Sequence, residues 1–393
     1  MRVIGMMSGT SYDAIDAVAV DIKRDGDELC VTILGSISES YSAGLRTDLA
    51  AQMPPAATSM EDVCRLDTRV GQEFAKLAAR ANMEICDGRA DAVASHGQTM
   101  FHWVQGGRVL GTLQLGEPAW IAEATGCTVA SGFRTRDVAA GGQGAPLVSL
   151  FDVLWLRHLS GSPAALNLGG IANITVTSGE PLAFDTGPAN ALIDAAVAAA
   201  TGGALSYDHD GEIGARGTVN SALLDQLLSE NYYGLPAPKT TGKELFHLPY
   251  LTAAMAASGT ADLALPDVVA TLAALTARTV AEAVAKAGGT TVVASGGGTR
   301  NPTLMKVLAQ ELLRSCGSGV KLLTSDDLGL PSAAKEAVAF AVLGYLTLNG
   351  VPGSVPSCTG ARHASILGNI TPGSRGLSLP PRLPEPPTSL RIQ

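Results

Sequence analysis

Residues 5–16 (Gly-Met-Met-Ser-Gly-Thr-Ser-Tyr-Asp-Ala-Ile-Asp) carry groups that could hold a phosphate. The run follows a short apolar segment, and Gly9 permits a tight reversal that exposes backbone N–H groups. The two residues after Gly9 add hydroxyl donors. Asp13 and Asp16 bring carboxylates that could bind a divalent ion beside a bound phosphate. The chemistry predicted for this run is a phosphate-binding loop.

A Gly- and Ser-rich turn also occurs in ordinary hairpins, so this run alone is equally compatible with a polar turn. Three similar turns follow other apolar segments, at residues 95–99, 169–173 and 295–301. The last contains three consecutive glycines, which would let a flat ligand such as adenosine lie against the backbone. It is also compatible with a plain loop.

Asp185 lies where a predicted strand meets a predicted helix that begins near Pro188. It could cap that helix, since Asp is a preferred N-cap residue, or it could act as a general base in a cleft. Phosphoryl transfer needs a held polyphosphate, Mg²⁺ and an aligned oxygen nucleophile with a carboxylate nearby. The four turns and Asp185 could supply these. The chain lacks the P-loop pattern and the protein-kinase motifs, so an ATP site would use another architecture.

Other polar residues beside apolar segments are candidates for substrate contact. Arg134 could bind a carboxylate with its guanidinium fork, or pair with Asp137 at the surface. Glu336 lies near a helix start, where an acidic residue also suits the helix dipole. The candidates for a small-molecule pocket are His96, Gln98, Arg134 and Glu336.

Composition narrows the class of protein. A chain of 393 residues with 46% hydrophobic residues favours two domains of roughly 150–200 residues each. A net charge of −9 with 27 Lys and Arg argues against a nucleic-acid partner or an anionic membrane surface. The six scattered cysteines form no CxxC pair, which favours reduced thiols, a cytoplasmic location and no structural metal. We also identify no leader segment and no unbroken run of 18 apolar residues.

The hydrophobic pattern predicts an α/β fold with two similar halves that face each other across a cleft. Residues 204–262 have weaker periodicity and include the run Lys239-Thr240-Thr241-Gly242-Lys243, so we expect an irregular surface insertion there. The expected strands are 2–7, 14–22, 29–36, 91–95, 127–130, 164–168, 171–177, 182–184 and 291–295. The expected helices are 61–82, one from about 117, one after 188, 267–287, 302–315 and 332–348.

We expect a first domain over residues 1–130, with a segment of about 350–372 packing back on it. The second domain would cover 131–349. Residues 373–393 form a proline-rich tail that we expect to be extended or disordered.

These motifs together resemble those of the anhydro-N-acetylmuramic acid kinase family. Its signature runs GMMSGTSxDGxD, SHGQT, LNLGGIAN, FDTGPxN, GGGxxN and KEAxAFAxL, and all six occur here in that order over about residues 3–372. Residues 356–361 also match the family's PxxTGA element. One position departs from the signature: Ala14 stands where the family usually has Gly, which would be strained only at a positive φ.

The resemblance implies the sugar-kinase and actin type of fold, with two ribonuclease-H-like domains facing a central ATP cleft. It implies that ATP phosphorylates O6 of 1,6-anhydro-N-acetylmuramic acid while water, activated by Asp185, attacks C1 and opens the anhydro ring. Mg²⁺ would accompany ATP near Asp13 or Asp185, and the protein would be a homodimer. The residues expected to contact ATP are Gly9, Thr10, Ser11, Tyr12, Asp13, Ala14, Ile15, Asp16, Gly169, Gly170, Asn173, Gly296, Gly297, Gly298 and Asn301.

Two alternatives stay open on the sequence alone. An ordinary sugar kinase of the same fold would phosphorylate a free hydroxyl without hydrolysis. An actin-like or chaperone-like ATPase would hydrolyse ATP without consuming a sugar. The SHGQT motif together with Arg134 favours a small-molecule pocket over the second alternative.

Overall fold

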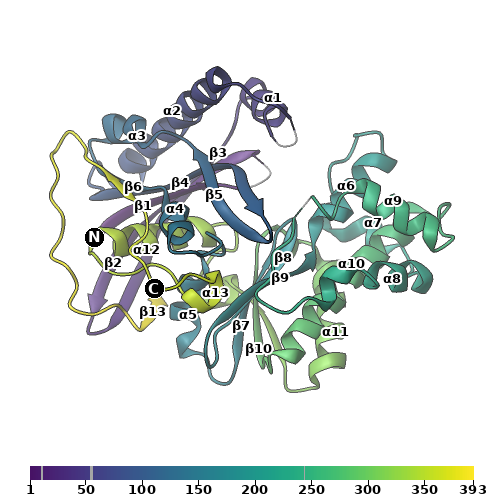
Figure 1. Ribbon diagram of the computed structural model, residues 1–393. Helices are drawn as coiled ribbons and strands as arrows, with labels where there is room; N and C mark the ends of the chain where they lie inside the picture. The colour runs from purple at the N-terminus through teal and green to yellow at the C-terminus, as the bar shows by residue number, and fades with distance from the viewer. Residues whose placement is uncertain (10–11, 54–55, 243) are drawn as a thin grey trace. The chain divides into compact units, whose positions relative to one another are not determined.

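The structure is a computed structural model that describes residues 1–9, 12–53, 56–242 and 244–393 (Figure 1). The chain forms two compact units. Unit 1 comprises Met1–Arg157 and Ala334–Gln393, and unit 2 comprises His158–Ala333. Each unit is an α/β body with its own sheet.

Unit 1 is built on an eight-stranded sheet in which seven strands follow the order β12-β6-β4-β1-β2-β3-β13 and β5 pairs with β4. β1, β2 and β3 form an antiparallel meander, whereas β4 runs parallel to β1 and β6 runs parallel to β4. The strands are β1 (Arg2–Ser8), β2 (Ala14–Asp25), β3 (Glu28–Ser40), β4 (Ala92–Gln105), β5 (Arg108–Leu115), β6 (Thr128–Ser131), β12 (Asn369–Thr371) and β13 (Ser389–Ile392).

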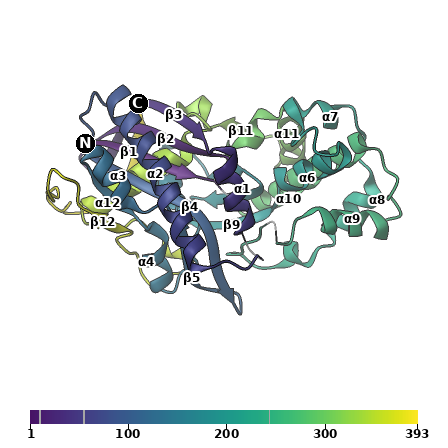
Figure 2. The ribbon, with the colours of Figure 1, turned by 90° about the horizontal axis from the view of Figure 1, so that it is seen from above.

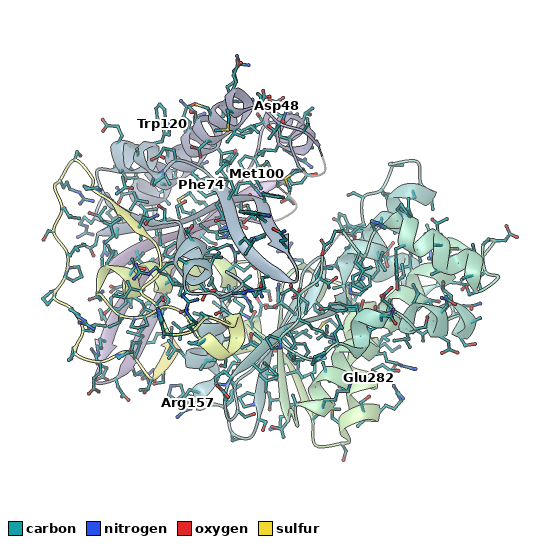
Figure 3. The ribbon with its side chains drawn as sticks, viewed as in Figure 1. Asp48, Phe74, Met100, Trp120, Arg157 and Glu282 are labelled. Carbon is teal, nitrogen blue, oxygen red and sulfur yellow. The ribbon has the colours of Figure 1, made fainter. Side chains whose placement is uncertain are left out.

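Helices cover both faces of this sheet because alternate residues of β1 point to opposite sides. Ile4 and Met6 pack in a core with Phe74 of α2, and Figure 2 shows α2 lying across the strands. Phe74 and Met100 mark this core in Figure 3, where both are buried. Gly5 faces α12, where a Cβ would lie 1.9 Å from the carbonyl oxygen of Ala337. The glycine therefore allows α12 to pack directly on the central strand.

The helices of unit 1 begin where the sequence supplies caps. Ser59 caps α2 through the N–H of Asp62, and Glu117 caps α3 ahead of Pro118. The helices are α1 (Ala43–Ala51), α2 (Met60–Glu84), α3 (Pro118–Thr125), α4 (Phe133–Ala139), α5 (Ser149–Trp155), η1 (Leu156–His158, which crosses into unit 2), α12 (Lys335–Leu348) and α13 (Pro356–Thr359).

Unit 2 repeats the strand order of unit 1 with five strands, β11-β10-β7-β8-β9. β7, β8 and β9 are an antiparallel meander, and β10 and β11 extend it in parallel. The strands are β7 (Pro163–Leu168), β8 (Ile171–Val176), β9 (Leu182–Pro188), β10 (Thr291–Ser295) and β11 (Lys321–Thr324). A meander followed by two parallel strands is thus present twice, which confirms the prediction of two ribonuclease-H-like α/β units.

One long helix, α10, forms the centre of the unit 2 core. By length and composition α10 could span a membrane, but most of its apolar surface is buried inside the unit, as expected for a core helix. The helices of unit 2 are α6 (Asn190–Ala200), η2 (His209–Gly211), α7 (Glu212–Ala215), α8 (Ser221–Leu228), η3 (Asn231–Gly234), α9 (Leu248–Ala257), α10 (Leu265–Lys286), η4 (Gly297–Arg300), α11 (Pro302–Cys316) and η5 (Asp326–Leu328).

Residues 204–262 differ from the expected irregular insertion. The described residues of this range form η2, α7, α8, η3 and α9, and Leu223, Leu227 and Phe246 are fully buried in the unit 2 core. The helices of this segment are short and each contributes only a few buried residues, so the hydrophobic periodicity of the sequence is weak there. It is a structural part of unit 2.

The units also divide the chain differently from the expected 1–130 and 131–349. Residues 131–157 and α12 belong to unit 1, because α12 packs on β1, β2 and β4 after the chain returns from unit 2. The proline-rich tail is extended, as expected, but it ends in an ordered strand. β13 pairs in parallel with β3, and Leu390 is fully buried.

Candidate active site

The loop after β1 is fastened to the end of β4 in unit 1. The buried Ser8 hydroxyl lies 2.7 Å from Oε1 of Gln98 and 2.8 Å from the carbonyl oxygen of Ala14, while Gln98 Nε2 donates to the carbonyl of Gly9. Gln98 is fully buried. Its amide is therefore consumed in holding the loop, and this differs from the expected sugar contact.

The described residues of this loop present one exposed carboxylate. Tyr12 has a φ of 43°, and its N–H donates to the carbonyl oxygen of Gly9 at 3.1 Å. The expected contacts of Thr10 and Ser11 lie outside the described residues. Asp13 is exposed, which leaves its side chain accessible to a cation.

The residues after Asp13 belong to β2. Ala14 is half-buried and has no positive φ, so the methyl group at this position costs nothing in backbone strain. The Ile15 side chain is 1% exposed and packs in the unit 1 core. Only its backbone could therefore reach a phosphate. Asp16, on the same strand, is half-buried.

His96 is buried and supports Arg134. Its Nδ1 lies 2.9 Å from the carbonyl oxygen of Gly97, and its Nε2 accepts a 2.9 Å hydrogen bond from Arg134 Nε. The ring packs on Phe340 of α12 with 4.5 Å between centroids. Burial, reinforced by the positive charge of Arg134, holds the pKa of His96 well below its usual range. A neutral ring with the proton on Nδ1 can accept from Arg134, and both nitrogens are then used.

Arg134 keeps one end of its guanidinium available. Nε donates to His96 and Nη1 donates to the carbonyl of Gly144 at 2.7 Å, whereas Nη2 makes no hydrogen bond with the described residues. Burial lowers the pKa of Arg134 to about 10, which leaves it charged at neutral pH. The arginine is therefore held in place with Nη2 free to meet an anionic group.

Asp137 is buried and organises the loop that holds Arg134. It accepts hydrogen bonds from Gly144 N–H at 2.8 Å and from the Thr359 hydroxyl at 2.8 Å. The expected alternative, a surface pair of Arg134 with Asp137, is therefore not what the structure contains. Thr359 lies 222 residues away from Asp137, so no local sequence pattern indicates that its hydroxyl donates to this carboxylate.

Glu336 lies in the first turn of α12 and is half-buried. Burial raises the pKa of its carboxyl group, while the nearby charges of Lys335 and Arg134 oppose that shift. Lys335 is itself buried and forms a 2.8 Å ion pair with Asp152 of α5. This pair fixes the start of α12, so Glu336 projects from a rigid helix end near Arg134.

His102 is a further candidate that the sequence analysis missed. Its Nδ1 is buried without a hydrogen-bond partner among the described residues. Burial and the positive charge of Arg134 lower the pKa of His102 to about 4, so the ring is neutral at physiological pH. The sequence signal that could have indicated His102 is its position six residues after His96.

In unit 2, Asp185 lies within β9 and is half-buried. Its Oδ2 accepts a 2.9 Å hydrogen bond from the N–H of Thr241, and Oδ1 accepts none from the described residues. Burial raises the pKa of Asp185 to about 6; the Thr241 bond opposes this rise, and the negative charge of Glu244 adds to it. A carboxylate with a pKa near 6 and one free oxygen is suited to general-base chemistry near neutral pH. The expected alternative, a helix cap, is not formed, because α6 begins after Ala189.

The two glycine-rich turns of unit 2 pack against each other. A Cβ on Gly296 would lie 2.9 Å from the carbonyl oxygen of Leu168, and one on Gly298 would lie 2.7 Å from the Leu168 side chain. The carbonyl of Gly169 accepts from Asn190 Nδ2 at 2.9 Å, which ties the first turn to α6. Glycine is therefore needed where the turns meet.

Three other expected contacts lie in the same unit. Asn173 of β8 is paired in register with Asp185, and Gly170 accepts from the backbone at the start of α6. Asn301 caps α11 through the N–H of Leu304 and is nearly buried, so its side-chain oxygen has a structural partner.

One feature of unit 2 is compatible with a bound polyphosphate: the backbone at Gly297 is open. A Cβ on Gly297 would meet no atom within 4 Å, so the backbone at the start of η4 is open to a ligand. The unpaired N–H groups of a helix start favour an anion. The exposed carboxylate of Asp13 in unit 1 is of the ligand type that Mg²⁺ prefers.

Comparison with known proteins supports one family. The family model for anhydro-N-acetylmuramic acid kinase matches residues 1–373. The chain is 62% identical to an anhydro-N-acetylmuramic acid kinase of Streptomyces avermitilis over 393 residues, with both chains covered completely. It is 60% identical to one of Rhodococcus erythropolis, again with full coverage of both. It is 38% identical to one of Caldanaerobacter subterraneus, covering 94% of this chain and 96% of the relative.

Two solved structures with a similar chain course have much lower sequence identity. A ROK hexokinase of Thermus thermophilus has a TM-score of 0.38 at 16% identity, covering 88% of this chain and 99% of that one. The (R)-2-hydroxyglutaryl-CoA dehydratase component A of Acidaminococcus fermentans has a TM-score of 0.43 at 13% identity, with 88% and 98% covered. Likenesses of this size say nothing about function.

We expect Thr359→Val to destabilise the protein by about 1–3 kcal/mol, because it leaves Asp137 Oδ1 buried without its donor. Thr388→Val is the matched control. Thr388 also donates to a carboxylate, that of Asp27, but at an exposed position where water can replace it, so its cost should stay within about 0.5 kcal/mol. Urea unfolding measures both variants. Equal costs for the two would contradict the role given to the buried bond.

Proposed function

Since the chain belongs to the anhydro-N-acetylmuramic acid kinase family, we propose that it transfers the γ-phosphate of ATP to O6 of 1,6-anhydro-N-acetylmuramic acid while water opens the anhydro ring. The products are ADP and N-acetylmuramic acid 6-phosphate. The reaction is a step in the recycling of cell-wall sugars. The observation that supports this most is the half-buried Asp185 within a matching family signature, whose Oδ1 accepts no hydrogen bond from the described part of the chain.

The proposed reaction needs one base. Asp185 Oδ1 accepts a proton from water as the water oxygen forms a bond to C1. The C1–O6 bond breaks, and O6 takes the phosphoryl group from ATP as it gains negative charge. Ring strain assists the cleavage, and the phosphoryl group captures the leaving oxygen, so a separate acid for O6 is unnecessary.

The proposal assigns binding roles to residues of both units, and the contacts within each unit support some of them. The Nη2 of Arg134, supported by His96 and Gly144, is suited to the lactyl carboxylate of the sugar. Glu336 and His102 would contact its other polar groups. The open backbone at Gly297, the turn at Gly169 and Gly170 and the loop from Gly9 to Asp16 would contact ATP.

Mg²⁺, when bound with ATP, would neutralise charge on the phosphates, and Asp13 is the exposed carboxylate suited to hold it. We extend the proposal to a cytoplasmic homodimer. The family supports the dimer, and the low cationic charge and the absence of a CxxC pair support the cytoplasmic location.

We expect Asp185→Asn to lower kcat by several orders of magnitude while ATP binding persists, because the amide cannot accept the proton of water. Steady-state turnover and nucleotide titration measure this. Asp262→Asn, an exposed carboxylate of unit 2, is the control and should behave as wild type. Asp185→Asn should also fold at least as stably as wild type at pH 8, since a carboxyl group whose folded pKa is raised destabilises the fold above its unfolded pKa. Near-normal turnover would exclude Asp185 as the base.

The pH dependence of the wild-type enzyme gives a separate test. Asp185 must be ionised to act, and burial places its pKa at about 6. Therefore kcat/KM should be flat near pH 7.5 and fall by about tenfold for each pH unit below pH 6. A profile that stays flat down to the ordinary pKa of an exposed carboxyl group would contradict the assignment.

A further inference from the structure

The run Lys239-Thr240-Thr241-Gly242-Lys243 is a motif that the proposed reaction leaves without a role. Residues 239 and 241 lie against the middle of β9. The N–H of Asp185 donates to the carbonyl of Lys239 at 3.0 Å, and the N–H of Thr241 donates to Asp185 Oδ2 at 2.9 Å. Both the backbone and the carboxylate of Asp185 are therefore bonded to this one segment.

Lys239 fastens the segment to the neighbouring turn η3. Its Nζ donates to the carbonyls of Tyr232 at 2.9 Å and of Tyr233 at 3.0 Å. The ammonium also lies 4.5 Å from the centroid of the Tyr232 ring, within range of a cation–π attraction. The side chain is half-buried, and burial with the charge of Lys286 lowers its pKa.

The contacts close into a ring. The Tyr232 hydroxyl donates to the carbonyl of Asp185 at 2.8 Å, so Asp185 is bonded to Lys239, Lys239 to Tyr232, and Tyr232 back to Asp185. Tyr232 is buried and packs edge-on against Phe246, which anchors the ring of contacts in the unit 2 core. Without the ammonium, two backbone carbonyls would lose their donor and the segment would lose its attachment to η3.

We propose that Lys239 is a positioning residue for the base: its ammonium holds residues 239–241 against β9, so that Thr241 fixes Oδ2 of Asp185 and leaves Oδ1 to receive the proton of water. The proposal rests on the function assigned above to Asp185. Lys239 acts through the segment, not by touching substrate.

The charges around Asp185 make its pKa sensitive to the position of residues 239–241, and the pH profile measures this pKa. Glu244 faces the carboxylate with the same charge, and Tyr232 is neutral because burial raises the pKa of its phenol. Among the described residues, the Thr241 N–H bond lowers the pKa of Asp185 against the effects of burial and Glu244. Loosening the segment removes that contact, so the acid limb of the pH profile should move to higher pH.

The test compares Lys239→Met with Lys306→Met, which removes an exposed lysine from α11 of the same unit. For Lys239→Met we expect kcat to fall by about ten- to a hundredfold, the KM values for ATP and sugar to stay within about twofold, and the acid limb of kcat/KM to shift upward. Lys239→Arg, which can still donate to both carbonyls, should recover most of kcat and the original limb. Lys306→Met should match wild type.

Other outcomes overturn the proposal. A folded Lys239→Met with wild-type kcat and pH profile would show that the lysine is not needed. A raised KM for ATP with an unmoved acid limb would make Lys239 a nucleotide contact instead. If Lys239→Met does not fold, Lys239→Gln, whose amide can serve one carbonyl, replaces it, with a smaller loss of kcat and a limb shift in the same direction expected.

A double substitution distinguishes the positioning role of Lys239 from the base role proposed for Asp185. If Lys239 acts only through Asp185, Lys239→Met should add no further loss to the residual rate of Asp185→Asn. A full additional loss would overturn the positioning role. An active Asp185→Asn would instead refute the proposed base, whatever the result at Lys239.

Discussion

The proposed chemistry depends on one carboxylate, Asp185, whose pKa burial raises to about 6, so that it is more basic than an exposed carboxylate yet ionised at neutral pH. Burial alone would push Asp185 toward its neutral form, and Glu244 adds to that tendency. One N–H donor, from Thr241, opposes both, and it bonds Oδ2 while Oδ1 accepts no hydrogen bond from the residues that the structure describes. The register of β8 on β9 sets where the carboxylate projects, and the residues after η3 decide which of its oxygens is used.

In unit 1 the important feature is the guanidinium of Arg134, which is held in position by neutral hydrogen-bond acceptors. Arg134 is supported by a neutral imidazole and a carbonyl, neither of which cancels its charge. The buried carboxylate that could have paired with it, Asp137, is occupied by Gly144 and Thr359. The hydrogen bonds to His96 and Gly144 fix the position of the guanidinium, while the nearby charges of Glu336 and Asp137 oppose the effect of burial on its pKa.

Much of the fold could be predicted from sequence because its strands are short apolar runs bounded by glycine-rich turns. The repeated meander followed from that pattern. Asp185 was expected where a strand meets a helix, but it lies within β9, because that strand continues to Pro188. Residues 204–262, which include Lys239, were expected to form an irregular surface insertion, because their helices are short and each has few buried residues; instead they contribute to the unit 2 core. His96 and Gln98 were selected by residue type, but the sequence does not reveal that their polar atoms are used internally. The bond between Thr359 and Asp137 joins distant parts of the chain and leaves no local pattern.

The most direct test of the central claim follows the oxygen of water. Purified protein is supplied with ATP, Mg²⁺ and 1,6-anhydro-N-acetylmuramic acid in ¹⁸O-water, and the sugar phosphate is analysed by mass spectrometry within minutes. Unlabelled N-acetylmuramic acid 6-phosphate incubated for the same time controls for exchange at the anomeric carbon. The account predicts ¹⁸O at C1 of an opened sugar phosphate. A phosphorylated product with no label from water, or ADP formed without consumption of the sugar, would contradict it.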